Sequence, residues 1–544
     1  MTTSQAQSIS VDNPFARSRE LFEKTCERLR QPEAFAMQHT DVERLLATEG
    51  RAILQQLFQD HLDLRGLHEQ AVPHLAVVGE DGVVRPHHRD ASRELRTLVG
   101  DVVVPRIGYS QRGATSLFPM DAALNLPADG FSLGVRHTVA MAAASNSFEE
   151  SVTSIEAMTG THVGKRQAEQ LARAAAVDFE EFYDERAAPV PASPPASPAS
   201  PPTPPSPASP ASPASLASPA PLLVMSSDQK GIVVRLEDLR PATRKARLAK
   251  TRRLKTRLTK GEKKYAKRMA MVTTVYTVVP HVRSADDILA DLLHETPPEK
   301  RRRPHAEQKR IWATIEKESD QAIARLFDEA EKRDPQHRLH WVVVVDGNKD
   351  QLALIETEAA RRGIAVTIVL DFIHVLQYLW AASTAFHEET APEREQWVLS
   401  RLREVLCGHA VDVAAGMRRS ATLRDLPAKT RAPVDECADY LLGYKAYLHY
   451  EDYLRDGLPI ASGVIEGGCR HLVNDRLGVT GAHWSLAGAE AILRLRALRS
   501  SGDLATYWAF HERREYERNH ADRYQGAVPR PHSPKSRPVL RLVK

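Results

Sequence analysis

The sequence predicts an α/β protein, in which a mixed β-sheet with flanking helices follows a mainly helical region that carries a small β-sheet and a helix-turn-helix. Three observations lead to this class. Short β-branched and apolar runs alternate with helical, charged stretches in the second half of the chain. Apolar residues recur at three- and four-residue spacing near the start. A segment of Pro, Ala and Ser separates the two halves.

The size and composition of the chain limit its class. At 544 residues the chain exceeds a single hydrophobic core, and one domain per about 150 residues predicts roughly three or four units. With 42% hydrophobic and 26% charged residues, the composition is that of a folded globular protein. The formal charge of +4 is too small to indicate a nucleic-acid partner by itself, so that evidence must come from where the basic residues gather.

Cysteine usage and hydropathy indicate where the protein works. Cys26, Cys407, Cys437 and Cys469 lie far apart without a C-x-x-C pair, which argues against a zinc ribbon and against a disulfide framework. The first residues are polar, and there is no apolar run of the roughly 18 residues that a membrane helix needs. We therefore expect a cytoplasmic, nucleoid-associated protein with no membrane partner.

Two regions are predicted at the start of the chain. Residues 1–72 form a helical region, because apolar residues such as Val42, Leu45 and Ile53 follow helical spacing. Residues 73–135 form a small β-rich region, in which β-branched runs are broken by Gly and Pro.

Residues 136–186 are predicted to form a helix-turn-helix. Ser147 opens the first helix with an S-x-x-E capping box, and Gly160 ends it. The second helix would present Lys165 and Arg166 to a DNA groove. Two helices joined by a Gly-containing turn are also common in proteins that never touch DNA, so both interpretations stay open. Residues 187–221, almost wholly Pro, Ala and Ser, are predicted to be an extended linker, with a polyproline ligand for a partner domain as a lesser alternative.

Residues 222–500 are predicted to hold the mixed sheet, and residues 501–544 a C-terminal helix and basic tail. The expected strands are short, apolar and β-branched. They cover residues 221–228, 231–236, 270–279, 341–345 and 364–370. Helical, charged sequence is expected from about 285 to 332, and a further helix over 349–362.

Three acids are placed to hold metal ions. Asp228 ends the first predicted strand and Asp346 the fourth, and adjacent strand ends converge at one edge of such a sheet. Glu466 follows on a helix in an unusually glycine-dense run, with Ser462 as its possible cap. Two cations about 3.5 to 4 Å apart, held by carboxylates, can activate a nucleophile and stabilise a leaving oxygen at a phosphodiester. An isolated Asp after a strand is commonly a turn former, so the prediction depends on the order of all three acids.

Basic residues gather at 240–268, where fourteen Lys or Arg stand against one acid. A solvated tail is the alternative, but the position between two predicted strands favours a DNA-contacting insertion in the catalytic domain. The expected phosphate contacts there are Arg244, Lys245, Arg247, Arg252, Arg253, Lys255 and Arg257. Arg470 and Arg476, close to Glu466, could also meet DNA phosphates.

Four motifs together resemble the insertion-sequence transposases of the ISKra type, which belong to the acid-triad (DDE) class. They are SSDQKGI around Asp228, VVVVDGNKDQL around Asp346, VLDFIHVLQYLW around Asp371, and IASGVIEGGCRHLVNDRLGVTGAHWSLAGAEAILRLRAL around Glu466. The resemblance covers most of the chain, and the last motif is long enough to be specific. It implies a ribonuclease-H-like core in which Asp228, Asp346 and Glu466 bind two Mg²⁺ or Mn²⁺ ions.

The D-x-x-H formed by Asp371 and His374 is similar to an auxiliary signature of several transposase families. An N-cap and a core histidine are the alternative. Since Asp371 also follows a strand, it rivals Asp346 as the second catalytic acid, and we prefer Asp346. The chain lacks a cysteine pair that members of the family carry in the β-rich region, so we expect no zinc.

The sequence therefore predicts a transposase that cleaves the ends of an insertion sequence, a mobile element, and joins them to target DNA. Its partners would be double-stranded DNA and further copies of itself, because pairing two element ends requires more than one active site. Two alternatives remain: a non-catalytic DNA-binding regulator, and a ribonuclease-H-like nuclease or resolvase that cleaves without joining.

Overall fold

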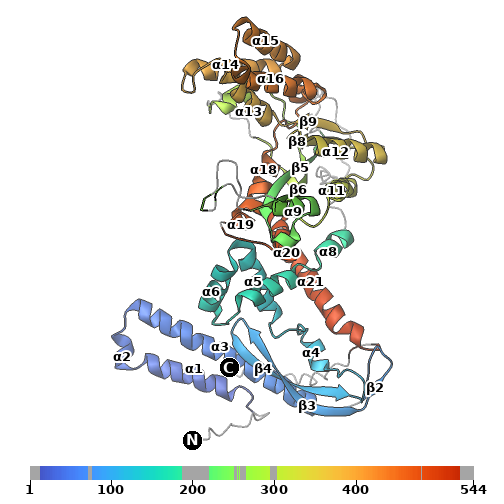
Figure 1. Cartoon of the computed structure of the whole chain (residues 1–544). Coiled ribbons are helices and arrows are strands. Elements are labelled where there is room, and N and C mark those ends of the chain that lie inside the picture. Colours follow the sequence, from blue (N-terminus) through green and yellow to red (C-terminus); the bar gives the residue numbers. More distant parts are fainter. Residues whose placement is uncertain are drawn as a thin grey trace, which may run out of the picture. The chain divides into compact units, whose positions relative to one another are not determined.

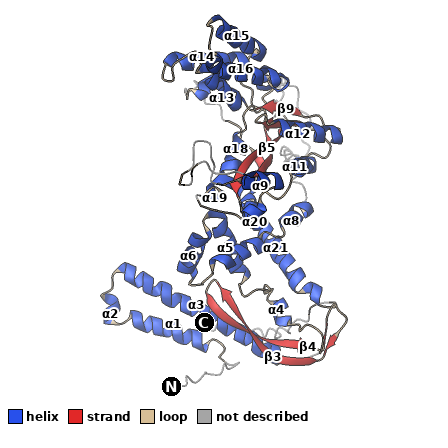
Figure 2. Ribbon diagram, in the orientation of Figure 1, coloured by secondary structure: helices blue, strands red, loops and turns tan. Residues whose placement is uncertain are grey.

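The computed structural model describes residues 13–71, 76–186, 220–249, 254, 256–257, 265–294, 303–479, 481–526 and 528. The chain divides into two compact units, and the elements of both are labelled in Figure 1. Unit 1 comprises Met1–Asp184 together with Gly502–Lys544, and unit 2 comprises Glu185–Ser501. Helices and strands occur in both units, which confirms the predicted α/β class (Figure 2). No helix among the described residues is both long and apolar enough to cross a membrane.

Unit 1 begins with an antiparallel pair of helices, as the apolar spacing predicted. Asp60 joins them: its carboxylate accepts hydrogen bonds from the backbone N–H of Ser18 at 3.1 Å and from the Arg17 guanidinium at 3.0 Å. The helices are α1 (Ala16–Leu29), the short α2 (Pro32–Phe35) and α3 (His39–Gln70).

The predicted β-rich region contains two separate two-stranded sheets. The larger is a hairpin whose register runs without a shift from the His87–Ser110 pair to the Thr97–Gly100 pair. Its apolar residues pack with Leu62 of α3. The first strand of this hairpin was not predicted, because HHRDASRELRT is mostly polar and largely exposed. The strands are β1 (Val77–Val78), β2 (Val84–Arg85), β3 (His87–Thr97) and β4 (Gly100–Ser110).

A buried acid under the hairpin makes the stability of unit 1 depend on pH. Glu69 is 5% exposed and accepts a hydrogen bond from the backbone N–H of Ile107 at 3.0 Å. Burial raises the pKa of its carboxyl from 4.5 to about 7. Between these pH values only the unfolded chain releases the proton, so the free energy of unfolding is expected to fall as pH rises through that window. Denaturation of Glu69→Gln should show a flatter pH dependence, while Glu33→Gln, at an exposed site, should match the parent protein.

The two helices of the predicted helix-turn-helix are present. Ser147 and Glu150 form the capping box, and Gly160 ends the first helix with a φ of 73°, a left-handed conformation that favours glycine. Phe131, Val135 and Ile155 contribute to the core that these helices share. The helices of this region are α4 (Pro119–Ala123), α5 (Leu133–Ser145), α6 (Phe148–Thr159), α7 (Lys165–Ala175) and α8 (Phe179–Glu185).

The C-terminal helix α21 (Leu504–Asn519) completes unit 1, followed by a 3₁₀ turn (Ala521–Arg523). The hydroxyl of the fully buried Tyr507 donates a hydrogen bond to the carbonyl of Ala175 at 2.7 Å. His511, also fully buried, lies with Nδ1 2.6 Å from the carboxylate of Asp178. These buried polar contacts fix α21 to the segment around α7 and α8 rather than to unit 2.

Unit 2 is built on one five-stranded mixed sheet with the order β7-β6-β5-β8-β9. The central strand β5 is antiparallel to β6 and parallel to β8, and β8 is parallel to β9. The strands are β5 (Leu222–Val233), β6 (Lys267–Val278), β7 (Glu307–Thr314), β8 (His340–Val345) and β9 (Thr367–Leu370).

Two predictions for this sheet were wrong. Residues 221–228 and 231–236 are not two strands, because β5 continues through Asp228 and Gly231 in unbroken register with β6. Asp228 therefore lies inside a strand, two residues beyond the last pair that β5 makes with β8. Strand β7 lies in the stretch predicted as helical. It is an edge strand with an exposed first half, so it lacks the continuous apolar run of a buried strand.

Helices cover both faces of the sheet. Gln351 of α12 lies beside Ser227 and Met271 on one face. The neighbouring residue of β6, Val272, points to the other face, toward α18. The helices before β9 are η1 (Leu236–Asp238), α9 (Pro241–Ala249), α10 (Ala285–Leu292), α11 (Ser319–Arg333) and α12 (Lys349–Arg362), and the last has the predicted bounds.

A group of helices that the sequence analysis did not assign follows β9. Its buried residues join those of β5, β8 and β9 in one continuous core. They are α13 (Phe372–Ser383), α14 (Pro392–Leu406), α15 (Ala410–Leu423), α16 (Ala428–Gly443), η2 (Lys445–Tyr447) and α17 (Tyr450–Arg455). The chain then returns to the sheet through α18 (Gly463–Gly468), a π-helical stretch (Cys469–Asn474), α19 (Asp475–Leu477) and α20 (Leu486–Ser501).

Candidate metal centre

Three aspartates lie on neighbouring strands of the five-stranded sheet, at the level where β8 and β9 end. We call this end of the sheet, with Asp228, Asp346 and Asp371, the acidic edge. The parallel register of β5 with β8, and of β8 with β9, is constant along each pair. Continued past the last paired residues, it brings Asp228, Asp346 and Asp371 to the same level on three neighbouring strands. Since neighbouring strands are about 4.8 Å apart, the edge concentrates carboxylates in a small space.

Asp371 is held rigidly at the start of α13. It is fully buried, and its Oδ1 accepts a hydrogen bond from the backbone N–H of Ile373 at 2.8 Å, which caps the helix. Its Oδ2 accepts hydrogen bonds from both the backbone N–H and the hydroxyl of Ser462. Ser462 occupies the expected N-cap position of α18, but its side chain makes no capping hydrogen bond, because the hydroxyl binds Asp371.

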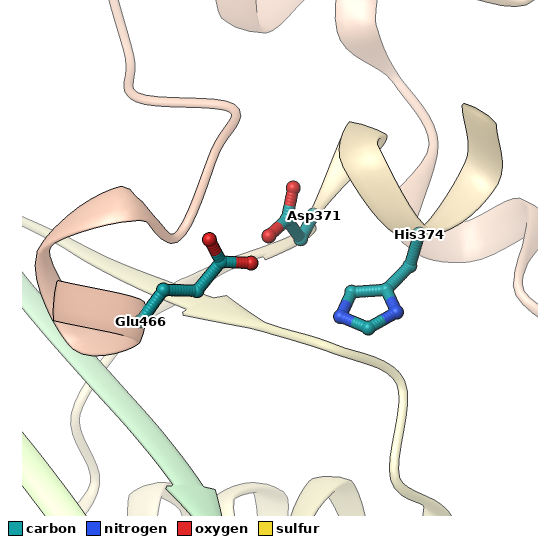
Figure 3. A group of neighbouring side chains, drawn as sticks. All are labelled: Asp371, His374 and Glu466. Atoms are coloured by element: carbon teal, nitrogen blue, oxygen red, sulfur yellow. The ribbon is translucent and has the colours of Figure 1, made fainter. Parts of the chain in front are cut away.

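Glu466 meets Asp371 and His374 in a group that could hold a metal ion. One ligand atom from each of the three side chains lies within 4.8 Å of the other two. Figure 3 shows the Glu466 carboxylate extending from α18 toward Asp371, with the His374 ring on the first turn of α13 facing the same space. Asp371 is buried, His374 is partly exposed and Glu466 is exposed, so the group is open to solvent on one side.

The donor atoms fit a divalent cation without selecting Mg²⁺. Two carboxylates and an imidazole can coordinate Mn²⁺ or Zn²⁺, whereas Mg²⁺ prefers oxygen ligands alone. The metal identity stays a prediction.

A glycine contact sets the position of the helix that carries Glu466. A Cβ atom on Gly468 would lie 2.0 Å from Cδ1 of the buried Ile311 on β7, so a larger residue there would require that side chain or α18 to shift. A Cβ on Gly463 or Gly467 would meet nothing within 4 Å. Packing against the sheet therefore explains Gly468. It does not explain Gly463 and Gly467, where a side chain would find open space.

Asp228 has two neighbours that the sequence analysis did not single out. The Cys469 thiol donates a hydrogen bond to Asp228 Oδ2 at 3.1 Å, and the Lys230 ammonium lies 3.0 Å from the same oxygen. Burial lowers the pKa of Lys230, but the hydrogen bond and charge of Asp228, with smaller contributions from Cys469 and Glu466, raise it overall. Lys230 therefore pairs with Asp228 and also senses the charge of Glu466.

Tyrosines from the helical group hold the backbone of the acidic edge. The hydroxyl of Tyr444 donates to the carbonyl of Gly347 at 2.5 Å, and that of Tyr450 donates to the carbonyl of Leu370 at 2.8 Å. Burial raises the pKa of Tyr440, and the carboxylates of Asp346 and Asp371 add to the increase. The sequence contains five tyrosines between residues 440 and 453, a pattern that could have pointed to these contacts. It was not used because no helix or strand had been predicted there.

The predicted DNA contacts have different surroundings. Arg476 does not fit its predicted role, because it is 3% exposed and its guanidinium lies over the Trp484 ring at 4.7 Å. Arg470 is exposed and 3.8 Å from Asp475. On α7, Arg166 is exposed, while Lys165 pairs with Glu149 at 2.8 Å.

The basic insertion is described only in part. Arg244 and Lys245 are exposed on α9, and Arg247 on the same helix is partly buried. Arg257 is exposed outside any helix or strand. Arg252, Arg253, Lys255 and nearly all of the predicted linker lie outside the described residues.

Comparison with known proteins adds nothing to the evidence from the side chains of this centre. No protein-family model matches the chain, and no curated protein matches it.

Proposed function

We propose that the chain is a DNA transposase of the DDE class, similar to the ISKra-type enzymes, that cleaves the ends of an insertion sequence and joins them to target DNA. The observation that carries the proposal is the meeting of Glu466 with Asp371 and His374 beside the sheet edge of Asp228 and Asp346. A carboxylate-rich edge, open to solvent and reached by a later helix, suits metal-assisted phosphoryl transfer.

The strand arrangement supports a ribonuclease-H-like core. Such a core requires the first and fourth strands to be neighbours, so that acids on both converge. Here β5 and β8 are parallel neighbours, and a hairpin partner flanks β5 on the other side. Glu466 then approaches from the helix that packs on β6 and β7, which brings an acid distant in sequence to the same edge.

Each group at this edge has a role in the proposed reaction. Asp228 and Asp346 would bridge two divalent cations and Glu466 would complete the site, with Asp371, which meets Glu466, as the rival of Asp346 for the second acid. Bound cations would activate the attacking water or 3′-hydroxyl and stabilise the leaving oxygen. Lys230 would neutralise Asp228 before a cation binds, while Ser462 and the tyrosines would keep the acids in position.

DNA would be bound outside this centre. Helices α6 and α7 would form the proposed helix-turn-helix, and Arg166 is exposed at the start of the second. Helix α9 presents basic side chains from the catalytic unit itself. We propose a homo-oligomer on DNA in a cytoplasmic, nucleoid-associated setting, as expected for an enzyme that pairs two ends.

The reaction products distinguish the proposal from its alternatives. Labelled element ends, supercoiled target DNA and Mg²⁺ or Mn²⁺ are incubated with the full chain. Joined products support a transposase, and cleavage without joining identifies a nuclease or resolvase. Binding without either product identifies a regulator.

Paired substitutions test which aspartate is the second catalytic acid. We expect Asp346→Asn to abolish joining with little change in stability, because Asp346 is partly exposed and asparagine can still accept the hydrogen bond from the backbone N–H of Asn348. Asp371→Asn should retain the helix cap, since asparagine also caps well, but its amide group would face the backbone N–H of Ser462, so it should destabilise the protein more than Ser462→Ala, which keeps that bond. Joining rates, melting curves and Mn²⁺ affinities of the three variants provide the comparison. If Mn²⁺ affinity were lost in Asp371→Asn and retained in Asp346→Asn, Asp371 would be the metal ligand.

The salt dependence of binding tests the role of α9. Replacing both Arg244 and Lys245 by glutamine should weaken DNA binding and reduce the slope of log affinity against log salt by about 2, one unit for each lost phosphate contact. The matched control replaces the exposed Arg419 and Lys429 on α15 and α16. Equal slopes for both double variants would exclude direct phosphate contact by α9.

A further inference from the structure

Unit 1 contains a pocket that the proposed catalytic function does not use. Its volume is about 360 Å³, within the range of pockets that bind small molecules. The wall combines segments around β3, β4 and α4 with the end of the C-terminal helix. Besides Thr115 and Ser116, its polar side chains are Arg93, Arg106, Asp121, Asn519, His520 and Arg523.

The pocket has an excess of positive charge. Arg93 and Arg106 are 16% and 13% exposed, and both lie against the single carboxylate of Asp121. Arg523, at the exposed edge, adds a third guanidinium. Burial lowers the pKa of His520 below its ordinary value, although the hydrogen bond from its Nε2 to the carbonyl of Leu126 at 2.9 Å acts in the opposite direction, so its neutral form is favoured at neutral pH. Three guanidinium groups therefore face one lining acid.

Glu69 lies behind this wall and does not remove the excess. Its carboxyl is within electrostatic range of Arg106 and Asp121, but burial raises its pKa to about 7. Its neutral form is therefore favoured more strongly than that of a free glutamate, so it balances the guanidinium groups only in part. A positive charge that is largely removed from water is costly unless an anion balances it.

Two buried polar atoms in the pocket have no hydrogen-bond partner within the described part of the chain. They are Nε of Arg106, a donor, and Oδ1 of Asp121, an acceptor. Buried polar groups are nearly always paired, so a ligand that offers both an acceptor and a donor would satisfy them. The edge of a nucleic-acid base offers both.

The rest of the wall is apolar and partly aromatic. Leu117, Leu126, Pro127 and Tyr524 line it, and the Phe118 ring lies 3.9 Å from the Arg106 guanidinium carbon. A flat apolar wall next to guanidinium groups suits a planar ring attached to a phosphate.

We propose that this pocket binds a nucleotide, with its base against the apolar wall and its phosphate beside Arg523 and Arg93. The nucleotide comes either from solution or from DNA in which one base is turned out of the stack. This site is independent of the metal centre in unit 2, so its failure and that of the proposed function can be told apart.

Calorimetric titration of the full chain in EDTA tests the proposal without catalysis. The probes are the four deoxynucleoside 5′-monophosphates, deoxyadenosine and inorganic phosphate. We expect a monophosphate to bind with a Kd below about 1 mM, and phosphate or the nucleoside at least about tenfold more weakly. Equal affinity for phosphate alone would mean a simple anion site, and absence of binding by every monophosphate would equally overturn the proposal.

Two variants localise the binding. Arg523→Ala removes an exposed guanidinium and is expected to weaken binding at least about fivefold, since a charge-assisted contact to phosphate is lost. Ala128→Trp, at an exposed position on the pocket wall, should block entry. Arg30→Ala on the distant helical pair is the matched control, and melting curves verify folding. Unchanged affinity in both pocket variants would overturn the assignment.

Competition separates the two sources of the nucleotide. A duplex with one extrahelical base and a fully paired duplex are each titrated against bound monophosphate. Displacement by the first duplex alone, lost in Ala128→Trp, assigns the pocket to a turned-out nucleotide of DNA. Displacement by neither duplex assigns it to free nucleotides.

Discussion

Replacement of Glu466 by glutamine is expected to lower the rate of strand joining by about 10³-fold. A bound cation stabilises the charge of the transition state by several kcal/mol, and roughly 4 kcal/mol corresponds to that factor. Glutamine keeps the size of the side chain but removes the negative charge. Because Glu466 is exposed on α18, the free energy of unfolding should change by less than about 0.5 kcal/mol. Joined products are measured on labelled DNA at saturating Mn²⁺, beside melting curves.

A matched control and a binding measurement make this result specific. Glu436→Gln removes an exposed carboxylate from α16 in the same unit and should leave joining unchanged. The affinity for Mn²⁺, followed by electron paramagnetic resonance, should decrease in Glu466→Gln alone. Full joining activity in Glu466→Gln would show that Glu466 is not needed for the reaction and would contradict the proposed metal centre.

Removal of the Asp178 carboxylate should cause the largest loss of stability. Asp178 is 3% exposed and is bound by His511, which is fully buried, and by Arg518. Truncation to alanine leaves the buried His511 without this acceptor, while Arg518, which is 36% exposed, keeps only Glu515. Breaking a fully buried ion pair costs about 3 to 5 kcal/mol, and the exposure of Arg518 places the expected loss at the lower end of that range. Urea denaturation of the full chain should show this loss in the transition of unit 1.

An exposed ion pair between the same parts of unit 1 is the control for Asp178. Glu181 lies 2.8 Å from Arg514, and the two side chains are 40% and 32% exposed. Exposed pairs contribute at most about 1 kcal/mol, so Glu181→Ala should be nearly neutral. Equal losses in the two variants would show that burial of Asp178 adds nothing to the attachment of α21.

The elements that sequence analysis predicted well have simple local signals. The apolar run of β8 and the capped, amphipathic α12 are recognisable from their own residues. β5 was divided in two because Asp228 and Gly231 resemble a turn, whereas twelve consecutive pairs with β6 keep the strand extended. β7 was not predicted, because its own composition does not indicate a strand. It is extended because it pairs with β6 at the side of the sheet.

The candidate centre was predicted in its residues but not in their grouping. Asp371 and His374 were predicted as auxiliary residues, yet they are the ones that meet Glu466. That meeting depends on Gly468 packing against Ile311, a contact between residues 157 positions apart, which spacing along the chain cannot show. The same limit applies to Cys469, whose thiol reaches Asp228 across the space between helix and sheet.

The discontinuity of unit 1 changes how a deletion would have to be interpreted. A protein shortened after Ser501 would retain all five strands of the sheet and every acid at its edge. The deletion would nevertheless remove hydrogen-bond partners from three residues that remain, Tyr183, Asp178 and Arg136. The lost partners are Asp503, His511 and Glu515, respectively. The loss of stability would therefore appear in the remaining N-terminal part of unit 1. Inactivity of such a truncated protein would not show that residues 502–544 take part in catalysis.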